Sequence, residues 1–390
     1  MFRPDEISTE FGRRMYLFLF VLTFACTVGF QAWAILGTNF AVDVVGLNAE
    51  QFGIVQSVRE VPGLLTALVI ALLFLMREET LAAFAVLALG LGVLLTGMFP
   101  SYGGILCTTL LLSTGFHFFE ANNQSLILQA YDSRTAPLVM GRLRGLTAGG
   151  NLLAGVLILG CSSFLGFPEM YLIVGGLAFC AALYALFHRP DCSSLPKQRT
   201  GVVLKSRYWL FYALTILSGA RRQIFTVFSV LLLVQRFGYT ITDIAVLFTI
   251  NNLINWFLNP WIGKAINAWG ERRLLSLEYV SVLGIFAGYA LLENHLVICV
   301  LYIIDQMVFN FSIAVRTFFQ KIAAPADIAP SMAVSVTINH IAAVGVPAIG
   351  GMLWLIDYSI PFWMGAGLGL VSLVLVQYID RELRKGRAAA

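Results

Sequence analysis

The sequence predicts an all-α integral membrane protein with twelve transmembrane helices in two pseudo-symmetric six-helix bundles, and three observations support this fold class. Hydrophobic residues make up 59% of the 390 positions and charged residues only 12%, whereas about a quarter of the residues of a soluble domain are charged. Apolar runs of about 20 residues, the length that crosses a bilayer, recur along the whole chain. The basic residues between these runs gather in alternate loops.

Twelve apolar runs supply the predicted spans, which divide into two sets of six. A polar tract rich in proline, serine, lysine and arginine, residues 189–206, separates the two sets and predicts a cytoplasmic linker. We therefore expect an N-terminal bundle over residues 1–188 and a C-terminal bundle over residues 207–390. The predicted spans are 15–41, 51–76, 80–99, 102–130, 138–165, 168–188, 207–236, 240–266, 272–292, 295–323, 330–357 and 359–382.

The distribution of positive charge orients these spans. Lysine and arginine outside the spans are concentrated in the linker, near the chain ends and in alternate loops, whereas the opposite side carries essentially Arg236. Because loops rich in Lys and Arg stay in the cytoplasm, we expect a multi-pass protein of the inner or plasma membrane with both termini cytoplasmic. The first fourteen residues contain no apolar stretch before a cleavage site. We therefore expect the first span to act as its own insertion signal.

A weak internal repeat relates the two sets of spans. When the chain is shifted by 192 residues, the span boundaries coincide without a gap through the first two helices of each half. Six spans per repeat give both halves the same orientation, with an axis along the membrane normal. The aligned residues are Leu22-Thr23 with Leu214-Thr215, Gln31 with Gln223, Val42 with Val234, Gly46 with Gly238, and Arg59-Glu60 with Asn251-Asn252.

The loop after the eighth predicted span, GKAINAWGERRLL, carries a pattern of glycines and arginines. It resembles the G-x-x-x-D-x-x-G-R-R/K cytoplasmic loop of the major facilitator superfamily, with an asparagine in place of the acid and Glu271 inserted before the arginines. The equivalent first-half loop, LLFLMREETLAA, lacks the glycines, and an ordinary basic loop is the alternative interpretation. The residues of this predicted gating loop are Gly263, Asn267, Gly270, Arg272 and Arg273.

The predicted architecture, two six-span halves joined by a cytoplasmic linker, is similar to the same superfamily. That resemblance implies a secondary transporter that works by alternating access, with a small molecule bound between the halves. The fifth span reads GGNLLAGVLILG and has no proline, so the signature of the drug exporters of the superfamily is incomplete.

Catalytic and cofactor-binding signatures are absent from the sequence. It contains no Walker loop, no H-E-x-x-H or G-x-S-x-G motif, and no Cys/His set at metal-ligand spacing. Five of the six cysteines fall in apolar runs and none forms a CxxC pair, which is typical of small buried apolar residues. We expect no enzymatic activity, no cofactor, no metal and no nucleic-acid partner, and a monomer surrounded by membrane lipid.

Polar side chains inside the predicted spans are candidates for a substrate site, because they are costly at membrane depth and usually face a cavity or one another. On span eight, Asn252, Asn255 and Asn259 share one helical face. They either line a cavity or form hydrogen bonds between helices. The substrate-binding candidates are Gln31, Arg222, Gln223, Asn252, Asn255 and Asn310.

Ionisable residues inside the spans are candidates for proton coupling. Arg59 and Glu60 are adjacent in span two, and they either take part in transport or form a structural ion pair. His117 and Glu120 share a face of span four, and they form either a titratable pair or a satisfied internal hydrogen bond. The candidates for proton coupling or ion pairing are His117, Glu120, Asp305, Arg59, Glu60 and Arg221.

The balance of these charges suggests the substrate class. Four arginines, at 59, 221, 222 and 316, face three acids, at 60, 120 and 305, which leaves one net positive charge. Because a guanidinium binds carboxylate or phosphate through two hydrogen bonds, we expect a small organic anion or amphipathic molecule, with coupling to protons through the acids. The alternatives are a multidrug-type efflux pump, a transport-dead membrane receptor and a polytopic membrane enzyme. One chamber near the bilayer midplane is predicted to gather Gln31, Glu120, Arg222, Gln223, Asn252 and Asp305.

Overall fold

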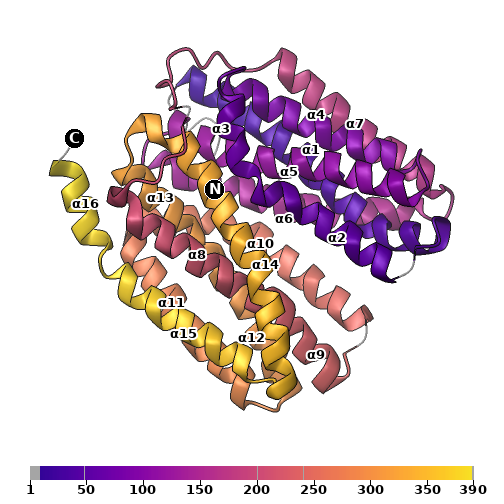
Figure 1. Ribbon diagram of the computed structural model, residues 1–390. Helices are drawn as coiled ribbons and strands as arrows, with labels where there is room; N and C mark the ends of the chain where they lie inside the picture. The colour runs from indigo at the N-terminus through magenta and orange to yellow at the C-terminus, as the bar shows by residue number, and fades with distance from the viewer. Residues whose placement is uncertain (1–8, 48, 200, 240, 389–390) are drawn as a thin grey trace. The chain divides into compact units, whose positions relative to one another are not determined.

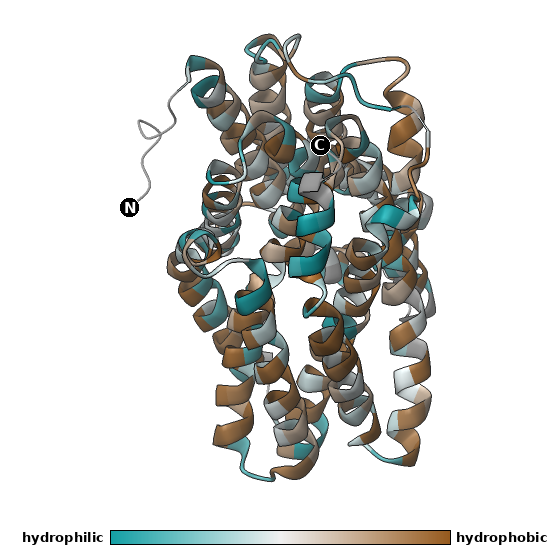
Figure 2. Cartoon of the chain, turned by 90° about the vertical axis from the view of Figure 1, so that its left-hand side faces the viewer, coloured by the Kyte–Doolittle hydropathy of each residue, from teal (hydrophilic) through white to brown (hydrophobic). Residues whose placement is uncertain are grey.

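The computed structural model describes residues 9–47, 49–199, 201–239 and 241–388, and every regular element within these ranges is helical. Apolar residues run along the helices, and hydrophilic residues gather at their ends and on the last helix (Figure 2). Within the described residues, ten helices are long and apolar enough to cross a membrane, and a bent pair raises the number to eleven. The predicted all-α membrane fold is therefore confirmed.

The first six spans begin and end close to the predicted boundaries. Thr9 caps the first span through a 3.1 Å hydrogen bond from the Gly12 amide, and Ser101 caps the fourth span in the same way. Pro62 lies inside the second span, which bends by 41° between Leu64 and Thr66. The elements are α1 (Glu10–Asn39), the π-helix η2 (Phe40–Val44), α2 (Ala49–Leu64), η3 (Thr66–Leu68), α3 (Val69–Leu72), α4 (Glu78–Thr96), α5 (Tyr102–Ala130), α6 (Thr135–Cys161) and α7 (Phe167–Phe187).

The second six spans contain more irregular turns. The seventh span passes through a π-helix, and the tenth is interrupted by a short 3₁₀ turn. The elements are η4 (Ser206–Tyr208), α8 (Trp209–Gln223), η5 (Ile224–Ser229), α9 (Val230–Phe237), α10 (Ile241–Trp269), α11 (Glu271–Leu291), α12 (His295–Phe309), η6 (Asn310–Ser312), α13 (Ile313–Ile322), η7 (Pro325–Asp327), α14 (Ile328–Ile356), α15 (Ile360–Val376) and α16 (Ile379–Ala388).

The count of ten or eleven helices leaves out the eighth predicted span, which is α10. It is 29 residues long, which is more than enough to cross a bilayer. It differs from the other long helices in carrying Asn251, Asn252, Asn255 and Asn259, which make it less apolar.

The helix boundaries show the internal repeat more clearly than the residue identities do. The starts of α4, α5, α6 and α7 at 78, 102, 135 and 167 correspond to those of α11, α12, α14 and α15 at 271, 295, 328 and 360, a constant difference of 193. Ala136-Pro137 then aligns with Ala329-Pro330, and Pro168 with Pro361. The predicted offset of 192 thus becomes 193 from the third span of each half onward.

Close backbone contacts divide the chain into two compact units. Unit 1 comprises Met1–Asp132, Leu143–Val203 and Pro325–Thr337, and unit 2 comprises Ser133–Arg142, Leu204–Ala324 and Ile338–Ala390. The two predicted halves thus exchange short segments, because the start of α6 groups with unit 2 and the start of α14 with unit 1. The halves 1–188 and 207–390 remain a proposal for the division of the chain into domains.

Each unit has a core formed by its third span. In unit 1, α4 packs against α5 and α7 (Figure 1). A Cβ atom added at Gly175 would lie 2.8 Å from the carbonyl oxygen of Gly90, so these two glycines allow α4 and α7 to approach as closely as small residues do in membrane helices. In unit 2, α11 packs in the same way against α15.

The predicted linker forms hydrogen bonds and an ion pair with other residues of unit 1. Gln198 donates to the side chain of Gln129 at 2.9 Å and to the carbonyl of Pro325 at 3.0 Å. Arg199 pairs with the fully buried Asp327 at 2.9 Å. The linker therefore joins the end of α5 to the turn that precedes α14.

Candidate functional site

A cluster of ionisable side chains lies in unit 1, on α2 and α5. Arg59 donates from Nε and Nη2 to Glu60 Oε1, at 3.0 and 2.8 Å. His117 Nδ1 is 4.0 Å from Glu120 Oε2, and the metal-ligating atoms of Glu60 and His117 lie within 4.8 Å of each other. The imidazole is therefore held near two carboxylates, one from each helix. We call Arg59, Glu60, His117 and Glu120 the histidine cluster.

Helix packing produces the histidine cluster. Because α2 lies against α5, the face of α5 that carries His117 and Glu120 meets the face of α2 that carries Arg59. The Ser113 hydroxyl, one turn before His117, donates to the backbone carbonyl of Arg59 and joins the two helices. On the other side, Gln124 Nε2 donates to Glu120 Oε1 at 3.3 Å. The sequence had placed all four candidates on two helices, and the structure brings them together.

A second buried cluster lies in unit 2, on α8, α11 and α12. Arg221 Nη2 is 2.5 Å from Glu278 Oε1, and the exposed fractions of the two side chains are 3% and 0%. The guanidinium also stacks over the ring of Tyr279, 4.6 Å from its centroid. Asp305 is buried near this pair and next to the Tyr289 hydroxyl. Arg221, Glu278 and Asp305 form what we call the buried triad.

Glu278 corrects the charge balance expected from the sequence. The expected excess of one positive charge omitted this carboxylate, although it lies inside the predicted ninth span. With Glu278 included, the four arginines of that balance face four acids, and their net charge is zero. The signal was present, because a single acid inside an apolar run of that length rarely lacks a partner.

The buried triad is specific to the second half. The repeat places Gly29 at the position of Arg221 (221 − 192) and Ala85 at the position of Glu278 (278 − 193). The first half therefore has two small residues at the two positions that the Arg221–Glu278 ion pair occupies in the second half. Since a buried ion pair is weak evidence for stability, a role in transport is a reasonable hypothesis for these charges.

Arg222 differs from its neighbour Arg221, because its side chain is exposed. It shares a face of the seventh span with Ser218 and Thr226, which are one turn away on either side, and the Thr226 hydroxyl donates to the Arg222 carbonyl at 2.5 Å. Among the residues that the structure describes, none forms a hydrogen bond or ion pair with the Arg222 guanidinium. Its polar face makes Arg222 a candidate ligand for an anion.

The remaining substrate candidates have mixed surroundings. Asn310 Nδ2 donates to Asn255 Oδ1 at 2.9 Å, and both side chains are buried. This pair therefore forms a hydrogen bond between helices, one of the two alternatives given for the asparagines of span eight. Asn252 is half-buried and donates to the carbonyl of Phe248 at 3.0 Å. Gln31 on α1 and Gln223 on α8 are also half-buried. The single chamber expected to gather residues from both halves stays a prediction.

The predicted gating loop contacts the start of α6. Gly263 lies against Pro137, since a Cβ atom added at Gly263 would meet the Leu138 Cα at 2.8 Å. Asn267 Nδ2 donates to the carbonyl of Arg134 at 2.7 Å, and Gly270 makes the turn into α11 with a φ of 78°. The two arginines of the loop diverge: Arg272 pairs with Asp380 of α16 at 2.9 Å, and Arg273 is exposed.

Comparisons with known proteins agree with this architecture. The model of the Major Facilitator Superfamily matches residues 15–344. A search of curated proteins finds no significant match.

Solved structures show the same fold at low sequence identity. FucP of E. coli, a fucose:proton symporter, superposes with a TM-score of 0.75 at 13% identity, covering 93% of this chain and 98% of that one. The human organic anion transporter MFSD10 (TETRAN) gives 0.73 at 12%, covering 94% and 99%. A bacterial homologue of the iron transporter ferroportin, in an outward-facing state, gives 0.76 at 11%, covering 94% and 99%.

Proposed function

Because this chain belongs to the Major Facilitator Superfamily, we propose that it moves a small organic anion across the inner or plasma membrane together with protons. It is a multi-pass membrane transporter rather than an enzyme. The substrate class, the coupling to protons, and the cytoplasmic placement of both termini are the parts that we add. Of the similar structures, one is of an organic anion transporter and one of a proton symporter, but identities of 12–13% carry only the fold.

The observation that carries the proposal is the histidine cluster. Histidine changes its charge between about pH 5 and 8, and His117 lies near the carboxylates of Glu60 and Glu120. A proton on the imidazole can be passed to either carboxylate, and Arg59 already neutralises Glu60. A small displacement of α2 against α5 would change which carboxylate His117 faces, so that proton transfer is linked to helix movement.

Arg222 supports the choice of an anionic substrate. It provides a guanidinium on a polar, exposed helix face, while Arg221 is neutralised by Glu278. A bound carboxylate would give Arg222 the counter-charge that no described residue supplies. In this proposal Gln223 and Asn252 add neutral hydrogen-bonding groups to the substrate site.

A ligand screen tests the substrate class. Purified protein would be heated with a panel of mono- and dicarboxylates, sugar phosphates, neutral sugars and lipophilic cations. A ligand at 100 times its Kd stabilises by about 2.7 kcal/mol, so a binder should raise Tm by several degrees. We expect a carboxylate or phosphate to do so, and the Arg222→Ala variant to lose the shift while keeping its ligand-free Tm. A shift produced only by neutral sugars or lipophilic cations would exclude the anion.

A further inference from the structure

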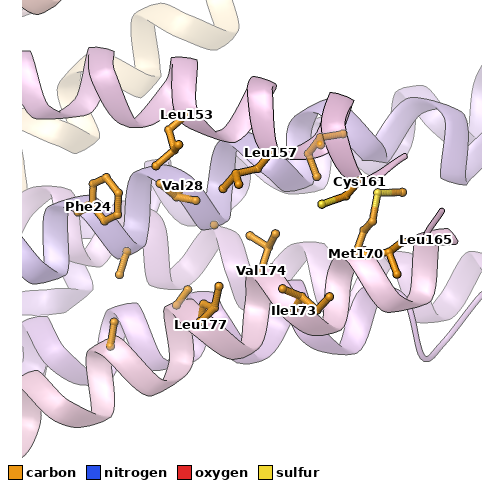
Figure 3. A pocket seen from close by; sticks show the side chains of 15 residues that line it. Phe24, Val28, Leu153, Leu157, Cys161, Leu165, Met170, Ile173, Val174 and Leu177 are labelled. Atoms are coloured by element: carbon orange, nitrogen blue, oxygen red, sulfur yellow. The ribbon is translucent and has the colours of Figure 1, made fainter. Parts of the chain in front are cut away.

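An apolar cavity of about 430 Å³ lies within unit 1, between α1, α6 and α7. Figure 3 shows Leu153 and Leu157 of α6 on one side, and Val174 and Leu177 of α7 on the other. Its lining contains no charged or hydrogen-bonding side chain; its least apolar members are Cys161 and Met170. The floor is buried, with Val174 8% exposed, whereas Leu177 on the rim is 65% exposed. The cavity therefore opens through an apolar rim.

The repeat places a larger side chain at one position of the corresponding surface in the second half. Cys161 corresponds to Trp354 (354 − 193), so a small side chain in the first half replaces an indole in the second. The Trp354 ring stacks on Phe228 of η5 with centroids 5.7 Å apart and lies edge-on to Phe362 of α15 at 6.1 Å. These three aromatic residues pack together between α14, η5 and α15.

We propose that this cavity binds an acyl chain of a membrane phospholipid. The shape fits a chain that runs parallel to the helices: the lining on α7 extends from Met170 to Ala181, which is about 16 Å at 1.5 Å per residue. The rim is continuous with exposed apolar side chains of α6 and α7, among them Leu159 and Leu172. In a membrane such a surface is covered by lipid, and a chain inside the cavity gains dispersion contacts with the cavity wall.

The end of the cavity indicates which lipid would enter. Cys161 and Leu165 lie at the turn between α6 and α7, where the segment Cys161–Gly166 contains no lysine or arginine. The charge pattern predicts that this turn faces away from the cytoplasm. A headgroup at the turn would therefore find no basic partner, which favours a zwitterionic phospholipid over an anionic one. This inference does not depend on the proposed substrate or on proton coupling.

Photolabelling tests the site directly. The protein would be placed in nanodiscs that contain phosphatidylcholine with a diazirine in the middle of one acyl chain, irradiated, and digested for mass spectrometry. We expect labels on peptides that carry Leu157, Val174 and Leu177. The Cys161→Trp variant, which copies the second half, should lose most of the labelling, because the indole would occupy the end of the cavity where the acyl chain would lie. The control Leu159→Trp, two residues away on α6 and 78% exposed, should keep it.

Further variants and competitors settle the other outcomes. If Cys161→Trp does not fold, as judged by size-exclusion chromatography, Leu157→Trp at the rim provides the same test. Equal labelling of the wild type, the cavity variant (Cys161→Trp or Leu157→Trp) and the control Leu159→Trp would overturn the site. It would show that the labels come from ordinary contact with the surrounding lipid. Displacement of the photolipid by tetraphenylphosphonium, at concentrations that leave other labelled peptides unchanged, would assign the cavity to a drug-like cation and overturn the proposal as well. Stronger labelling by phosphatidylglycerol than by phosphatidylcholine would contradict the choice of headgroup.

Discussion

At the scale of single residues, Arg221 and Arg222 are neighbours in sequence but have different surroundings, because successive residues of a helix point about 100° apart. Arg221 is sealed against Glu278 and Tyr279, whereas Arg222 faces the exposed polar side of the same helix. Replacing Arg221 by alanine should therefore affect mainly stability, and replacing Arg222 by alanine should affect mainly transport.

We expect Arg221→Ala to lower the free energy of unfolding by about 3–5 kcal/mol, because it removes the positive partner of the buried Glu278 carboxylate. Arg222→Ala should leave stability nearly unchanged and abolish transport. Thermal unfolding of both purified variants, with transport assays beside it, checks this contrast. Equal loss of stability in the two variants would mean that Arg222 has a packing role.

Cys192 in the linker provides a second test at this scale. Burial raises the pKa of its thiol to about 12, and the nearby carboxylate of Glu79 adds to the effect. Only the thiolate reacts with alkylating agents, so a raised pKa means slower labelling at a given pH. In folded protein, labelling of the Cys192 peptide by iodoacetamide should keep rising between pH 8 and 10.

After denaturation in detergent, the same peptide should label quickly and level off above about pH 9, since an ordinary cysteine has a pKa near 8.5. Identical pH profiles in folded and denatured protein would show that the linker does not cover this residue.

Residue types and spacing could predict the two pairs of the histidine cluster, but not that the pairs meet, and not the buried triad. His117 and Glu120 are one turn apart, so a shared face follows from the sequence, and adjacency makes the Arg59–Glu60 contact easy to expect. The Arg221–Glu278 pair joins residues 57 positions apart, and only helix packing selects that partner. The hydrogen bond between Asn255 and Asn310 likewise joins residues that only helix packing brings together.

At the scale of helices, apolar length was the strongest signal in the sequence. It placed the spans, but it could not show that a π-helix interrupts the seventh span, because one extra residue in a turn leaves hydropathy unchanged. It also could not show that Gln198 and Arg199 anchor the linker, since these contacts depend on a turn some 130 residues later in the chain.

The contact between α6 and α10 gives a prediction at this scale. Gly263→Ala should push α10 away from Pro137 at a cost of about 1–3 kcal/mol, as overpacking usually does, and transport should slow. Hydrogen exchange of residues 135–142 should increase. The matched control is Gly284→Ala on α11, where a Cβ atom would meet nothing within 4 Å. Unchanged exchange in Gly263→Ala would exclude a gating role for this contact.

At the scale of the whole molecule, composition, loop charge and a faint repeat predicted two six-span halves, and the superfamily fold was what the resemblance of this architecture and of the loop after the eighth span implied. The repeat was faint because most aligned positions differ in residue type, whereas helix lengths are constrained by the bilayer and are retained. Its offset of 193 from the third span onward could be measured only from the helix starts.

Orientation is open to a direct test. In a cysteine-free background, Ser101→Cys in the turn before α5 should react with a membrane-impermeant maleimide added to whole cells. Ser133→Cys, in the turn before α6, should react only after the membrane is opened, because the arginines nearby keep that loop in the cytoplasm. Both turns are exposed, so access alone decides the result. The reverse pattern would invert the topology.

The central claim, that transport of a small anion is coupled to protons through the histidine cluster, is tested most directly by proton flux. Proteoliposomes with a trapped pH-sensitive dye would receive the carboxylate or phosphate identified by the ligand screen. We expect an immediate change of internal pH that Glu120→Gln and His117→Gln abolish or strongly reduce, while binding of the solute is retained. Radiolabelled solute that crosses the membrane with no change of internal pH, at equal rates in the wild type and both variants, would contradict the account.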